Sequence, residues 1–190
     1  GRQKGGESNI RRPAVTGRLE YVAIPGLSAG VSGWTGNSSF ALPRIETRVT
    51  FGEFDVRFRR ERLELRGQFA QVAISNAAQL NAAVGRLTGV SPNIAKTLRG
   101  FYTEGSYRVW ADGPGRDLVG FVRYENFDTQ YQMPAGFVPL KQFDRDAVVA
   151  GATYYPDPDV AVKVDYVWLR NQSAVVGAPN SFNVGIGWWF

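Results

Sequence analysis

The sequence contains neither cysteine nor histidine. Without cysteine there is no disulfide framework and no thiolate metal site, and without both residues the Ser-His and Cys-His nucleophile arrangements are excluded. General acid–base chemistry is left to carboxylates, lysine and tyrosine. The sequence therefore predicts a protein that is not an enzyme and that carries no metal or other cofactor.

Long hydrophobic runs are also missing. Hydrophobic residues make up 44% of the chain, but no run approaches the roughly 18 apolar residues of a spanning helix. This does not exclude a membrane, because a barrel strand crosses with about 10 residues, half of them polar. The chain starts with glycine and shows no signal segment, so we expect a processed product or a fragment.

Glycine and aromatic residues are abundant, with 22 Gly, 5 Trp, 8 Tyr and 12 Phe, which favours a sheet. The chain ends on a segment in which apolar residues occupy every second position. These residues are Phe182, Val184, Ile186, Trp188 and Phe190. The same alternation predicts nine strands in all. They cover about 15–23, 27–35, 45–58, 63–69, 101–109, 118–127, 148–154, 160–168 and 182–190.

Two irregularities are expected. The apolar positions of the third strand change phase between Phe51 and Phe54, which predicts a β-bulge near Gly52. Residues 76–87 place alanine, leucine and valine at helical spacing after Ser75 or Asn76 as a cap. We expect a short loop helix there, either folded into a lumen or packed over the barrel mouth.

The connections alternate between short and long, as in outer-membrane barrels, where turns are periplasmic and loops external. If the last strand runs from the outside to the periplasm, the first of nine alternating strands runs in the same direction. Bacterial single-chain barrels have an even number of strands, so a count of nine requires further strands upstream. The sequence thus predicts an all-β fold, the C-terminal part of a transmembrane antiparallel up-and-down β-barrel. Residues 1–12 are expected to be the tail of an external loop, and 13–190 the strands.

One face of these strands is apolar and suits lipid, with aromatic residues near the strand ends as interfacial girdles. The other face carries alternating acids and bases, which need water or partners. We predict that it lines a wet pore and sets fields that guide solutes, although simple mutual pairing also explains each single residue. The predicted pore-lining residues are Arg18, Glu20, Arg48, Glu53, Asp55, Arg57, Glu64, Arg66, Glu104, Arg108, Arg123, Glu125, Lys163 and Asp165.

The formal charge of +5 raises the alternative of a nucleic-acid partner. The densest basic cluster, at 57–62, is interrupted by Phe58 and Glu61, and a solvated turn between two strands explains it more simply. No nucleic-acid partner is therefore expected. The remaining basic residues fall in or beside the long connections, where they attract anions or bind phosphates of lipopolysaccharide in the outer leaflet. We predict a mild anion preference.

Several segments resemble the phosphate-selective porin family of Gram-negative bacteria. They are GFVRYE at 120–125 with DT at 128–129, YYPDP at 154–158, VKVDY at 162–166 and FNVGIGWWF at 182–190. The resemblance implies a 16-stranded, usually trimeric barrel that passes anions or other small hydrophilic solutes. The last segment also looks like the terminal signal read by the barrel-assembly machinery. No phosphate-binding residue of the family transfers to this sequence.

We therefore expect a porin in the outer membrane of a Gram-negative bacterium, passing small hydrophilic solutes with phosphate among the candidates. The first alternative is a barrel that serves as a structural anchor or adhesin through its external loops. The second is a membrane-embedded hydrolase using Asp144 and Asp146, which are more simply solvated loop residues beside a strand.

Overall fold

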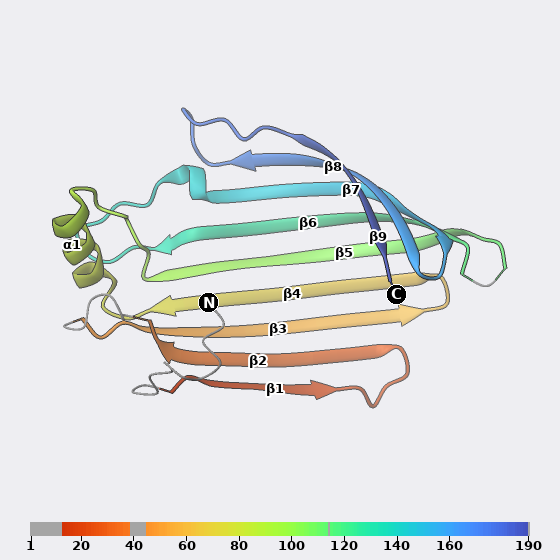
Figure 1. Ribbon diagram of the computed structural model, residues 1–190, viewed down its shortest axis with the longest axis horizontal. Helices are drawn as coiled ribbons and strands as arrows, with labels where there is room; N and C mark the ends of the chain where they lie inside the picture. Colours follow the sequence, from red (N-terminus) through yellow and green to blue (C-terminus); the bar gives the residue numbers. More distant parts are fainter. Residues whose placement is uncertain (1–12, 39–44, 114, 190) are drawn as a thin grey trace.

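The computed structural model describes residues 13–38, 45–113 and 115–189. Nine strands form one antiparallel sheet in strict chain order, with one α-helix and one short 3-10 helix between them (Figure 1). The elements are β1 (Val15–Tyr21), β2 (Leu27–Asn37), β3 (Arg48–Arg60), β4 (Leu63–Ile74), α1 (Ala77–Thr88), β5 (Thr97–Ala111), β6 (Asp117–Gln132), η1 (Lys141–Phe143), β7 (Asp144–Asp157), β8 (Val160–Asn171) and β9 (Ser181–Trp188). The predicted all-β, up-and-down order of nine strands is confirmed.

The long connections lie at one end of the sheet and the short ones at the other, as the sequence predicted (Figure 1). One of the short turns requires glycine. In the β1–β2 turn, Gly26 has a φ of 81°, and a Cβ there would lie 2.2 Å from the carbonyl oxygen of Arg59. The predicted tail at 1–12 and the terminal Phe190 lie outside the described residues.

The register of β3 is unbroken, so the bulge expected near Gly52 is wrong. Gly52 pairs with Gly33 on one side and with Gln71 on the other, in continuous ladders. Register shifts occur elsewhere instead, in the pairing of β5 with β6 and of β7 with β8. The apolar residues Val49 and Phe51 therefore stay in phase with Glu53 and lie on the charged side of the sheet.

The helix α1 confirms the predicted loop helix, but its start differs from expectation. Asn76 occupies the N-cap position in a left-handed conformation with φ 55° and makes no capping bond. Its amide instead donates to the carbonyl oxygen of Glu46 at 2.7 Å, which ties two long connections together. At the other end Gly89 closes the helix with φ 76°, as glycine commonly does.

The helix lies beyond the strand ends, beside the long connections (Figure 1). Asn81, only 1% exposed, donates to the carbonyl oxygen of Ile94 at 2.8 Å and accepts from its amide at 2.6 Å. Gln130 in β6 donates to the carbonyl oxygen of Asn93 and accepts from the amide of Leu140. These bonds fix the helix over the end of the sheet. No helix in the described part of the chain is long and apolar enough to cross a membrane.

Candidate functional site: the charged face of the sheet

The two faces of the sheet differ sharply in chemistry. Directly paired residues share a face and neighbours along a strand alternate, so the register assigns every strand residue to one side. One row, for example, joins Arg57, Arg66, Glu104 and Arg123 across four strands. We call this side the charged face and the other the apolar face.

The predicted pore-lining residues share the charged face, with one exception. Arg48 is an odd number of residues from Glu53 in the continuous β3 ladder, so it lies on the same side as Phe54. Grouping Arg48 with the charged wall was therefore wrong, because that assignment depended on a bulge that β3 does not contain. Arg48 sits at the start of the strand, where its amide donates to the hydroxyl of Ser75 at 2.8 Å.

The apolar face exposes large hydrophobic side chains along every strand. Leu19 is 74% exposed, Val122 57% and Ile186 66%. Further exposed residues of this face are Val15, Tyr21, Val31, Phe54, Leu65, Phe69, Phe101, Tyr107, Tyr124, Val148, Tyr154, Val164, Trp168, Phe182, Val184 and Trp188. A continuous surface of this kind marks contact with lipid or with another protein. It includes four of the residues proposed as the assembly signal, from Phe182 to Trp188.

On the charged face of β1 to β3, one ion pair and one lone carboxylate lie side by side. The guanidinium of Arg18 donates to both oxygens of Asp55, at 2.6 and 3.0 Å. Glu53 accepts instead from the hydroxyl of Ser32 at 2.8 Å and from the amide of Gln68. Among the described residues, no basic group lies within ion-pair distance of Glu53. Its carboxylate is therefore held by neutral donors, and Arg18 acts on it only through a longer-range charge interaction.

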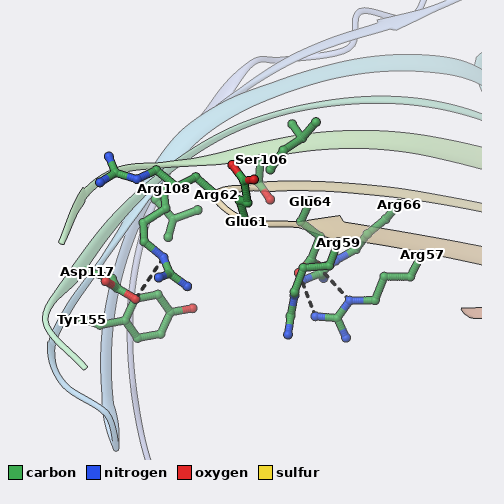
Figure 2. Close-up of a pocket in the computed structure, with 12 residues that line it drawn as sticks. Arg57, Arg59, Glu61, Arg62, Glu64, Arg66, Ser106, Arg108, Asp117 and Tyr155 are labelled. Atoms are coloured by element: carbon green, nitrogen blue, oxygen red, sulfur yellow. Dashed lines mark hydrogen bonds and ion pairs between the residues drawn. The ribbon is translucent and has the colours of Figure 1, made fainter. Parts of the chain in front are cut away.

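A pocket of about 310 Å³ opens on the charged face near the short turns (Figure 2). At its centre the Glu64 carboxylate, 12% exposed, accepts from the guanidinium groups of Arg57, Arg59 and Arg66. Arg57 approaches it with two parallel bonds of 3.0 and 2.9 Å, the fork geometry that guanidinium and carboxylate favour. We call this the basic pocket.

The other lining residues add to its charge. Arg108 pairs with Asp117 at 3.3 Å, and Arg62 and Glu61 lie at its rim. Five arginines thus face three carboxylates, which leaves two positive charges around one open volume. The solvated turn predicted for 57–62 is present only at 61–62. Arg59 belongs to β3 and bonds Glu64 at 2.8 and 2.6 Å.

Further along the wall, charges pair more evenly. Glu104, with a side chain only 8% exposed, accepts two bonds from Arg123, at 2.8 and 2.7 Å. Arg123 also contacts Glu125 at 3.1 Å. On β8, Lys163 and Asp165 lie 3.5 Å apart, so bases and acids here largely satisfy one another.

The charged face also carries an apolar row that the sequence did not predict. Trp34, Phe51, Val72 and Leu98 face one another in a row across β2 to β5. The phase change of the apolar positions in β3 was the signal that could have revealed this row. Apolar residues in phase with charged ones indicate either a β-bulge or an apolar row on the charged face. The wall thus combines apolar and charged regions.

The acidic residues considered for hydrolysis have structural partners. Asp146 accepts from the hydroxyl of Tyr124 at 2.6 Å and from the amide of Asn126 at 3.0 Å. Asp144 begins β7 beside it. Across the residues that the structure describes, no group of acidic side chains is arranged to hold a metal ion.

Comparison with known proteins gives one relative and no family. No family model matches the chain. An uncharacterised protein of Aquifex aeolicus (strain VF5) is 27% identical over 179 residues, which cover 87% of this chain but 39% of that protein. The chain therefore spans well under half the length of this relative.

Proposed function

We propose that this chain is part of a β-barrel in the outer membrane of a Gram-negative bacterium. The barrel forms a water-filled channel through which small hydrophilic solutes diffuse. The separation of the two faces carries this proposal. Exposed apolar residues on one side and ionised residues on the other suit a wall between lipid and water.

The apolar face needs a nonpolar neighbour. Burying one exposed side chain of the size of Leu or Phe contributes about 1.5–3 kcal/mol, so leaving this whole face in water is strongly unfavourable. A second sheet or a layer of helices would cover it in a soluble protein. Within the described residues no element packs on this face, since α1 lies beyond the strand ends (Figure 1). Lipid is the neighbour that suits it.

The charged face needs water for the opposite reason. An ion in a low-dielectric interior costs several kcal/mol even after relaxation, and a carboxylate such as Glu53, whose hydrogen-bond donors are neutral, would bear much of that cost. The side chains of Arg57, Arg59 and Arg66 are 42–60% exposed, so they are hydrated. A wide aqueous lumen satisfies these groups.

The edges of the sheet support a larger closed barrel. In the described chain, β1 pairs only with β2 and β9 only with β8. Bare strand edges are not tolerated in lipid, and closure into a barrel removes them. The longer Aquifex aeolicus relative has room for more strands. A total of 16 strands, a trimeric assembly and recognition of β9 by the assembly machinery are parts of the same proposal.

Reconstitution of the complete protein tests the channel. In planar bilayers we expect stepwise conductance, and in liposomes we expect swelling when an external sugar enters. Vesicles prepared without protein, and vesicles with heat-denatured protein, are the controls. Sealed vesicles would contradict a channel and favour the alternative of an anchor or adhesin, for which the fixed long connections offer a rigid external surface. Reversal potentials measured in a salt gradient test the expected mild anion preference.

A further inference from the structure

The charges on the charged face are sorted rather than mixed. The basic pocket holds five arginines and three carboxylates. On β1 and on the preceding part of β3, Glu20, Glu53 and Asp55 share the face with Arg18 as the basic partner. One side of this wall therefore carries excess positive charge and the adjoining side excess negative charge, with β3 contributing to both.

The basic pocket is suited to a carboxylate. A guanidinium has five N–H donors. Arg57 and Arg59 each donate to Glu64 through Nε and Nη2. Among the described residues their Nη1 groups bond no other group, so they can donate to a ligand in the open volume. Glu64 itself demonstrates the fit, because it is a carboxylate already held by paired guanidinium bonds.

Glu53 is suited to an ammonium group. Its two oxygens accept from Ser32 and Gln68, which are neutral, and carboxylate oxygens have further lone pairs to offer. Phe51 precedes Glu53 by two residues on the same face, and Trp34 lies directly opposite Phe51 on β2. An alkylammonium beside aromatic rings gains additional attraction from the ring faces.

The spacing of the two regions sets the length of a bridging ligand. Glu53 and Arg57 lie four residues apart on β3, which is about 13 Å between Cα atoms. Glu53 accepts from Gln68, whose backbone pairs with that of Asp55, one position nearer to Arg57 on the same face. An extended chain spans about 3.3–3.6 Å per residue, so a tripeptide reaches about 10 Å between its charged ends.

We propose that this wall binds short zwitterionic peptides, with the carboxylate end in the basic pocket and the ammonium end at Glu53. The inference rests on the channel proposed above. Such a site distinguishes a zwitterion from a simple anion, because inorganic phosphate would bind in the basic pocket alone. Binding is weak and reversible, as passage through a channel requires.

The experiment is a titration of channel block in planar bilayers with the complete protein. Triglycine is the zwitterionic probe, N-acetyl-triglycine lacks the ammonium, and inorganic phosphate reports on the basic pocket. Each variant is compared with its own unblocked current. We expect unmodified triglycine to block at lower concentration than its acetylated form, by about fivefold, the effect of one exposed charge interaction near the upper end of the measured range.

Two substitutions separate the ends of the ligand. Glu53→Gln should weaken the block by triglycine about fivefold and leave the block by N-acetyl-triglycine unchanged. Arg59→Gln should weaken the block by both peptides and by phosphate. The matched controls are Asp112→Asn and Arg116→Gln, which make the same changes of charge in the turn between β5 and β6 at residues that do not line the pocket. They should change neither block.

The outcomes are distinguishable. Equal block by triglycine and its acetylated form in the wild-type channel would show a simple anion site and overturn the proposal without any substitution. An unchanged triglycine block in Glu53→Gln, together with a weakened one in Arg59→Gln, would overturn it in the same way. If the complete protein carries no current in the bilayer, the proposed channel is contradicted, and the peptide site that rests on it is contradicted as well.

Discussion

Replacing a valine by arginine on each face of β8 tests which side meets lipid. Val164 lies on the apolar face and is 39% exposed, between Ala152 of β7 and Val184 of β9. Val167 lies on the charged face, two residues from Asp165. The two substitutions are chemically identical and three residues apart.

The expected costs differ because the solvents differ. Arginine at the lipid face of a barrel costs about 2–4 kcal/mol near the bilayer midplane and less near its surfaces. The paired neighbours of Val164 are apolar, and it sits inside the apolar stretch of β8, so we expect about 3 kcal/mol for Val164→Arg. In Val167→Arg the new guanidinium lies on the water-filled side near the Asp165 carboxylate, so the free energy of unfolding should fall by less than about 1 kcal/mol.

The assay is urea unfolding of the complete protein from lipid vesicles, with stability read from tryptophan fluorescence. A difference of about 3 kcal/mol corresponds to more than a hundredfold in the unfolding equilibrium. If both variants cost under about 1 kcal/mol, the apolar face does not meet lipid. That result is expected for a water-exposed valine, whose replacement is usually within about 0.5 kcal/mol of neutral.

Three further substitutions probe individual contacts. Glu64→Gln leaves three guanidinium groups facing one another and should destabilise the barrel by about 1–3 kcal/mol in the same urea assay, while strengthening block by phosphate. Asn81→Ala removes two buried hydrogen bonds, and hydrogen exchange should become faster in 75–96 while the strands keep their protection. Gly151→Ala places a Cβ 2.3 Å from the carbonyl oxygen of Val164 and should cost about 1–3 kcal/mol, whereas Gly120→Ala meets nothing within 4 Å and should be nearly neutral by thermal melting.

The strands were largely predictable because their signal is local. Alternation with a period of two depends only on neighbouring residues, and the order of hairpins follows from short turns such as that at Gly26. Six strands, β2 and β4 to β8, proved longer than predicted, whereas β1 ends earlier and β3 begins later than expected. β5, for example, begins at Thr97 instead of residue 101, since ladder pairing continues past the apolar stretch.

The site was less predictable because it depends on alignment between strands. The sequence placed Glu64 and Arg66 on one face, but nothing local shows that Arg57 and Arg59 of the preceding strand both reach the same carboxylate. The β3 register decides this pairing. The β3 register also explains why Arg48 was wrongly assigned to the charged face, because a register shift of one residue moves a side chain to the opposite face.

The sequence by itself determined the sheet, its nine-strand order and the division into an apolar and a charged face, since these follow from residue type and spacing along the chain. Only the tertiary structure decided which charges meet. The basic pocket, the bond of Ser32 to Glu53 and the bonds of Asn81 to Ile94 join residues from different segments. Their geometry is set by cross-strand register and loop packing, which no local pattern encodes.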